Sequence, residues 1–252
     1  MQKYTLHDKQ KFDDIFWNKK YPWEVEKQYI EKTIKYIKYI KWIPGIKMIG
    51  IWNSISMNSA TLDSDIDLFI VSDNNRMWLV RILCTLIFQV LWVRKTEKKH
   101  AWRMCLSFFC TLKTVDFWEF SLEKDPYLYF WILYFKPLLD NNGTYSLFLE
   151  KNKSWADFSE FGNIIEENKS WIKYSKEILS TEGFNPLKKK EWKYCFPTKI
   201  LNIINNLLKK LFLPKTLRHY KKLWKPFWII INDNMLKFHN WDIRKQIAKK
   251  MW

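Results

Sequence analysis

Two aspartates, Asp65 and Asp67, stand one residue apart in an apolar stretch, TLDSDIDLFIV, at residues 61–71. The stretch has the length and composition of a short buried strand. Because side chains alternate along a strand, both carboxylates point to one face, with Cα atoms about 7 Å apart. Two carboxylates among apolar neighbours are costly unless a positive group lies between them. Magnesium binds carboxylates together with phosphate oxygens, so the pattern predicts a metal site on a strand.

A second apolar run, residues 46–52, precedes Asn53 and Ser54, and ten residues separate Ser54 from Asp65. We expect a strand over residues 46–52 and a short helix over residues 53–60. Free amides at the start of such a helix can hold phosphate oxygens, with the Ser54 hydroxyl as a further donor. The ordinary alternative for Ser54 is a helix N-cap.

Together these segments, IGIWNSISMNSATLDSDIDLFIV at residues 49–71, resemble the DNA polymerase beta-type nucleotidyltransferase superfamily. The resemblance is closest to its small stand-alone bacterial and archaeal domains, and it covers about residues 40–110. It implies transfer of a nucleoside monophosphate from an NTP, such as ATP, to an acceptor hydroxyl with release of pyrophosphate. In that reaction Asp65 and Asp67 would hold two Mg²⁺ ions, and Asn53 and Ser54 would hold the triphosphate. Asn53 stands where the family usually has glycine, and asparagine tolerates a positive φ better than most residues.

The family usually takes a third carboxylate from a later strand beside the aspartate pair. Residues 101–111, AWRMCLSFFCT, are expected to form that strand, but they contain no acid. Asp116 follows shortly afterwards and is the candidate for the third catalytic acid. The alternatives are an acid from elsewhere, catalysis without one, or a catalytically impaired nucleotide- or nucleic-acid-binding module of the same fold.

The expected fold class is α+β, with a small mixed β-sheet covered by helices and a mainly helical C-terminal region. Asp125 and Pro126 are typical of the start of a helix. The turn cluster at residues 140–143 predicts a boundary, with a nucleotidyltransferase-like core over residues 1–143 and a helical, basic region over residues 144–252. Helical periodicity and composition predict helices over residues 23–42, 75–94, 144–182 and 199–212.

The charge is unevenly distributed. The formal net charge is +17, and residues 183–252 hold 17 Lys or Arg against three acids. This favours a polyanionic partner, with nucleic acid first and anionic lipid second, although a lysine-rich genome composition would give the same bias. The stretch LRHYKKLWK at residues 217–225 mixes aromatic and basic residues, as single-stranded nucleic-acid sites do. His239 and Asp242 are close enough in sequence to pair, as a catalytic base or as a structural contact.

The remaining features concern partners and location. The four cysteines show no CxxC pairing, so Cys84 and Cys105 are interpreted as buried thiols and no zinc site or disulfide framework is expected. The first ten residues lack a signal-peptide pattern, and the apolar run at residues 78–93 is shorter than a membrane span. We therefore expect a cytoplasmic protein without stable membrane insertion. The expected partners are an NTP, an RNA or protein acceptor, and a helical protein of the kind that small members of the superfamily work beside.

Overall fold

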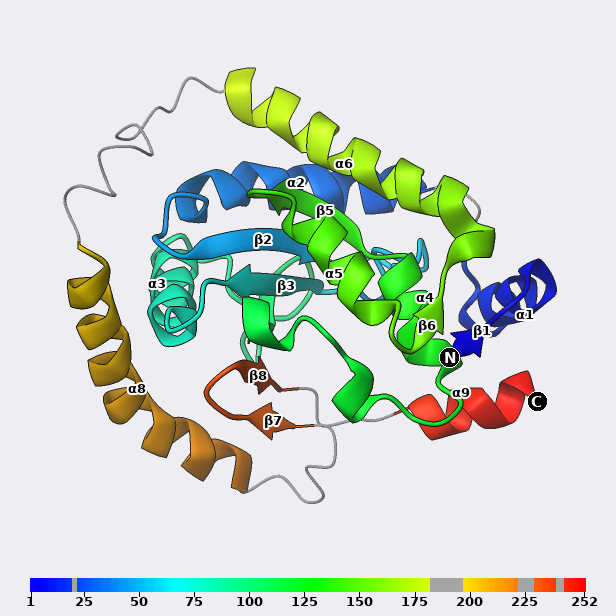
Figure 1. The fold of residues 1–252 in the computed structure, drawn as a ribbon. Coiled ribbons are helices and arrows are strands. Elements are labelled where there is room, and N and C mark those ends of the chain that lie inside the picture. Colours follow the sequence, from blue (N-terminus) through cyan, green and yellow to red (C-terminus); the bar gives the residue numbers. More distant parts are fainter. Residues whose placement is uncertain (20–21, 182–196, 222–228, 239–242) are drawn as a thin grey trace.

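A central mixed sheet organises the chain (Figure 1). The computed structural model describes all residues except 20–21, 182–196, 222–228 and 239–242. Within the described residues the sheet has six strands in the order β5-β2-β3-β4-β8-β7, in which β3 and β4 run parallel and the other neighbours antiparallel. The strands are β2 (Ile46–Ile51), β3 (Ile66–Ser72), β4 (Met104–Thr111), β5 (Lys136–Asp140), β7 (Ile230–Ile231) and β8 (Met235–Lys237). The expected α+β class is confirmed.

Strand β3 is buried on both faces because helices cover the sheet from both sides. Ile66, Leu68 and Ile70 belong to the core formed with α2 (Glu24–Ile40) and α3 (Met77–Val90). Phe69 and Val71 belong to the second, aromatic-rich core. The helices on that side are α1 (Leu6–Phe16), α4 (Pro126–Leu133), α5 (Thr144–Asn152) and α9 (Arg244–Met251). Asp67 has the parity of Phe69, so it faces the α4 side at the start of the strand.

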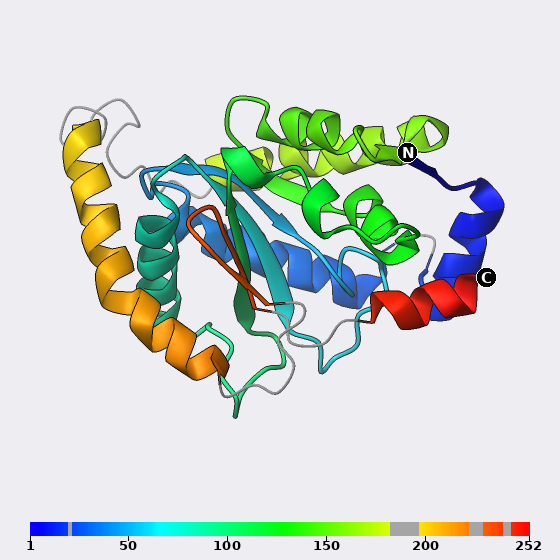
Figure 2. The ribbon, with the colours of Figure 1, turned by 60° about the horizontal axis from the view of Figure 1, so that its bottom comes forward.

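Two long helices flank this core at its edges (Figures 1 and 2). Helix α6 (Gly162–Thr181) packs against β5 and α2, and α8 (Thr198–Lys221) packs against α3. The side chain of Asn205 on α8 accepts from the first amides of α3, those of Trp78 (3.0 Å) and Leu79 (3.1 Å). The guanidinium of Arg76 donates to the Thr198 carbonyl (3.0 Å). The C-terminal half of the chain thus caps the helix that follows the aspartate strand. The remaining elements are a small parallel pair, β1 (Gln2–Lys3) with β6 (Ala156–Asp157), and three 3-10 turns, Leu112–Thr114, Trp118–Phe120 and Ser159–Phe161.

Local signals in the sequence correspond to elements of the structure. Strands β2 and β4 and helices α2, α3 and α8 lie within or largely overlap the expected ranges. Helix α4 begins as predicted, because the Asp125 side chain accepts from the Leu128 amide (2.9 Å) and Pro126 occupies the first turn.

One expectation about the chain's layout was wrong, and two strand pairings were not expected. The predicted continuous helix over residues 144–182 is interrupted after Asn152, because the Asn152 side chain bonds the Phe117 amide, the Val115 carbonyl and the Trp155 indole and so ties the chain to the core. Residues 136–140 form edge strand β5, where a proline is tolerated. Strands β7 and β8 extend the same sheet beside β4, so residues on both sides of the expected boundary at residue 143 contribute strands to one sheet.

A search of the described residues found no helix with both the length and the apolarity needed to cross a membrane.

Candidate metal and nucleotide site

Asp65 and Asp67 lie at the start of β3, beside the start of the parallel strand β4. Asp67 pairs in register with Cys105, the second residue of β4. One ligand atom from each of Asp65, Asp67 and Cys105 lies within 4.8 Å of the other two. Since metal–oxygen and metal–sulfur bonds are about 2.0–2.6 Å long, donors at this spacing can surround one cation. The structure thus brings both predicted carboxylates together, and it adds a thiol in place of a third acid.

Polar neighbours fix the two carboxylates. The Lys95 ammonium lies 2.7 Å from Oδ2 of Asp65. The carboxylate of Asp67 accepts from Nδ2 of Asn53 at 2.7 Å and from the Ser107 hydroxyl at 3.3 Å. Lys95 is itself held where the chain enters β4, because its amide donates to the Met104 carbonyl (2.9 Å). Both aspartates are therefore oriented before any ligand arrives.

The site carries an excess of negative potential. Burial, followed by repulsion from Asp67, raises the pKa of Asp65, and the hydrogen bond from Lys95 partly offsets this. Burial and then the two aspartates raise the pKa of the Cys105 thiol well above its ordinary value. Burial alone would lower the pKa of Lys95, but the surrounding anionic groups raise it. A bound cation would relieve this repulsion and would favour the ionised forms of all three ligands.

The turn after β2 faces the pair through Asn53. Asn53 adopts φ 60°, as its replacement of glycine predicted, and its amide group links Asp67 to the Tyr127 hydroxyl (3.2 Å). Within the described residues, the backbone amides of residues 53–56 donate no hydrogen bond, and neither does the Ser54 hydroxyl. Ile55 and Ser56 are fully buried, whereas Asn53 and Ser54 are partly exposed. The unused amides of Asn53 and Ser54 and the Ser54 hydroxyl, next to a carboxylate pair, suit a phosphate-bearing ligand.

The short helix expected over residues 53–60 is not formed. Residues 53–58 form consecutive turns, with one hydrogen bond of the α-helical type, from the Met57 amide to the Asn53 carbonyl (3.0 Å). Left-handed φ values at Asn53 and Asn58 bend the chain at both ends of this segment, and such values are incompatible with a right-handed helix.

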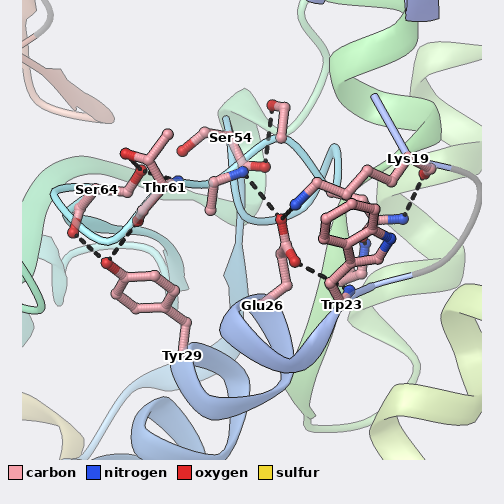
Figure 3. A network of polar contacts seen from close by, with 11 residues as sticks. Lys19, Trp23, Glu26, Tyr29, Ser54, Thr61 and Ser64 are labelled. Atoms are coloured by element: carbon pink, nitrogen blue, oxygen red, sulfur yellow. Dashed lines mark hydrogen bonds and ion pairs between the residues drawn. The ribbon is translucent and has the colours of Figure 1, made fainter. Parts of the chain in front are cut away.

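Side chains of α2 hydrogen-bond to the connection between β2 and β3 (Figure 3). Glu26 is fully buried, pairs with Lys19 (2.8 Å) and accepts from the Ala60 amide (3.1 Å). The Tyr29 hydroxyl lies within hydrogen-bond distance of the carbonyls of Thr61, Leu62 and Ser64, at 2.9–3.1 Å. These contacts hold one amide and three carbonyls of the connection just before Asp65, and they fix the position at which β3 starts.

Asp116 is not part of this group. It lies beyond Thr111, at the far end of β4 from Cys105, and its carboxylate accepts from the Trp118 amide (2.9 Å) within a local turn. His239 and Asp242 lie outside the described residues.

Three residues of the site escaped the sequence analysis: Cys105, Ser107 and Lys95. Cys105 had been interpreted as an inert buried thiol. Cys105 and Ser107 stand two apart on the predicted third strand, and that alternation was the one available signal that they share a face. Lys95 lies in the connection before this strand, and no local pattern points to it.

Comparisons with known proteins give no assignment. No protein-family model matches the chain, and no curated protein or solved structure shows significant similarity to it.

Proposed function

We propose that the protein is a metal-dependent nucleotidyltransferase that moves a nucleoside monophosphate from an NTP to an acceptor hydroxyl and releases pyrophosphate. One observation carries the proposal: the ligand atoms of Asp65, Asp67 and Cys105 converge within 4.8 Å beside a turn with unused amides. Neither feature alone is specific. Together they provide the two things that phosphoryl-type transfer requires, a cation site and a phosphate cradle.

Each group of the chain has a role in this proposal. Asp65, Asp67 and Cys105 hold the metal, which when bound neutralises phosphate charge and activates the attacking oxygen. Asn53 orients Asp67 through its 2.7 Å hydrogen bond, while the amides of Asn53 and Ser54 and the Ser54 hydroxyl hold the phosphates. The family resemblance implies two Mg²⁺ ions. Each carboxylate has two oxygens and can serve two ions, whereas the thiol favours an ion softer than magnesium.

The test is pyrophosphate release from ATP, GTP, CTP or UTP in the presence of Mg²⁺ or Mn²⁺. The double variant Asp65→Asn/Asp67→Asn should abolish release while its circular dichroism spectrum and unfolding transition stay close to those of the wild type. The matched control is Asp63→Asn, an exposed acid in the same connection, which should keep full activity. Turnover retained by the double variant would refute the assignment.

A second candidate is a binding module of the same fold without turnover. The Lys95–Asp65 ion pair favours it, because the lysine already supplies a positive charge to the carboxylates. So does the lack of a third carboxylate among the described residues around the pair. Such a module would bind NTP in a manner that depends on Asn53 and Ser54, and it would release no pyrophosphate with any acceptor.

A further inference from the structure

A basic pocket lies on the α3 side of the sheet, between the end of α3 and the loop that leads into β4. Its volume is about 230 Å³, and four of its lining residues are the cations Arg94, Lys98, Lys99 and Arg103. No acid lines it. Among the described residues none of these four cations forms an ion pair with a carboxylate, and the Arg94 guanidinium contacts only the neutral side chain of Gln89 (3.3 Å). The pocket lining therefore carries a net positive charge.

The pocket and the candidate site share one segment of chain. Lys95, whose ammonium contacts Asp65, sits between the pocket-lining residues Arg94 and Thr96. The carbonyl of Arg103 accepts from the Ile66 amide (2.8 Å), and Ile66 lies between the two aspartates. Since β3 and β4 are parallel, the loop before β4 and the connection before β3 lie at the same end of the sheet (Figure 2). The pocket and the metal site therefore lie at one end of the sheet, the pocket on its α3 side and Asp67 on its α4 side.

An aromatic side chain completes the pocket. Trp92 lines it and is 78% exposed, like several other tryptophans of the chain, but among the described tryptophans it is the one that stands beside these cations. Its φ of 55° turns the chain out of α3 at this point. The positive patch continues onto α2, where burial and then repulsion from Arg103 and Lys35 lower the pKa of Lys32. Lysines that follow a phosphate backbone and an exposed aromatic ring on which a base can stack are the usual components of single-stranded nucleic-acid sites.

We propose that this pocket binds single-stranded nucleic acid and that the acceptor hydroxyl of the proposed reaction is the end of that strand. Arg94, Lys98, Lys99 and Arg103 contact its phosphates, and one base stacks on Trp92. The inference rests on the proposed function for the chemistry, but the binding site stands on the pocket itself. The proposed binding site differs from the one expected from the sequence, which was the basic C-terminal region. The residues that would contact the nucleic acid here lie between 92 and 103.

The test measures binding and not turnover, so that its failure is distinct from failure of the proposed reaction. The probe is a fluorescein-labelled single-stranded oligouridylate, followed by anisotropy over a range of salt concentrations, on the Asp65→Asn/Asp67→Asn background. Lys98→Gln/Lys99→Gln should weaken binding about tenfold at low salt and should make the negative slope of log K against log[salt] shallower by about 1.4. Trp92→Asn, which keeps a residue tolerant of positive φ, should weaken binding at least about fivefold and leave the slope unchanged.

The matched control is Lys151→Gln/Lys153→Gln, two exposed lysines around the end of α5 that carry the same change of charge. It should bind as the parent does. Equal loss in the pocket and control variants would show a non-specific charge effect and overturn the proposal. So would undiminished oligouridylate binding in the pocket variants, or binding of phosphatidylserine vesicles in place of the oligonucleotide at this pocket.

Discussion

The Lys95 ammonium and the Asp65 carboxylate lie 2.7 Å apart, within the group that also contains Asp67 and Cys105. In this arrangement the lysine is a built-in counter-ion. It lowers the repulsion between two carboxylates that point to the same place, and it competes with any metal for Asp65. The Lys95 side chain is 40% exposed and the Asp65 side chain 22% exposed. Solvent therefore weakens the attraction, and the ion pair contributes about 1 kcal/mol to stability.

The first prediction follows from this competition. Lys95→Met should tighten Mn²⁺ binding about fivefold, the equivalent of about 1 kcal/mol, because a neighbouring positive charge and a competing donor are both removed. Titration calorimetry, or the loss of the free Mn²⁺ signal in electron paramagnetic resonance, would measure the change. Lys113→Met removes an exposed lysine elsewhere and should leave the affinity unchanged. Weaker binding in Lys95→Met would show that the lysine supports the metal site and does not compete with it.

The second prediction concerns metal choice. Cys105 offers a sulfur ligand, which is softer than a carboxylate oxygen. The wild type should therefore prefer Cd²⁺ or Zn²⁺ over Mg²⁺ more strongly than a site made only of carboxylates would. Cys105→Asp should raise Mg²⁺ affinity and lower Cd²⁺ affinity. Cys105→Ser, close in shape, should lower Cd²⁺ affinity without raising that for Mg²⁺. The ultraviolet absorption band of a cadmium thiolate gives a direct readout, and its absence in the wild type would exclude Cys105 as a ligand.

The contacts of Lys95 and Cys105 could not be predicted from the sequence, whereas those of the two aspartates could. The approach of Asp65 and Asp67 follows from their spacing and apolar flanks, which are local, and so does the positive φ of Asn53. The contacts of Cys105 and Lys95 depend on which strand pairs with β3 and in which register, and that is decided by packing between distant segments. Strand β5 was missed for a related reason. Its Lys136-Pro137 sequence has the appearance of a helix stop, and only its edge position in the sheet makes the proline acceptable.

The third prediction separates the backbone role of Asn53 from its side-chain role. Asn53→Gly and Asn53→Ala both lose the hydrogen bond to Asp67 and should both be destabilised, by about 1.5–3 kcal/mol for a bond to a charged group. Alanine should be worse by a further 1 kcal/mol or so, since only glycine adopts φ 60° without a steric cost. Urea unfolding of the two variants side by side measures the difference. Equal stability would mean that the turn relaxes to a negative φ.

Lys136 supports the same turn from the other side. It is 5% exposed on β5, and its ammonium donates to the Ser56 carbonyl and to the Asn58 side chain (3.1 Å). Its two hydrogen-bond acceptors are neutral. Burial lowers its pKa from 10.5 to about 8, and the more distant carboxylates of Glu167 and Glu26 only partly oppose this. Lys136 thereby ties the Ser56 carbonyl and the Asn58 side-chain oxygen to β5.

The fourth prediction is that Lys136 makes stability rise with pH in an alkaline window. The unfolded chain keeps the lysine proton up to about pH 10.5, whereas the folded protein releases it near pH 8. The unfolded state therefore binds more protons between these values, and the free energy of unfolding increases with pH. The full change is worth about 3 kcal/mol. It should appear as a difference between wild type and Lys136→Met in urea unfolding at several pH values, because the buried tyrosines titrate alike in both proteins and cancel. Parallel pH profiles would show that Lys136 stays charged in the fold.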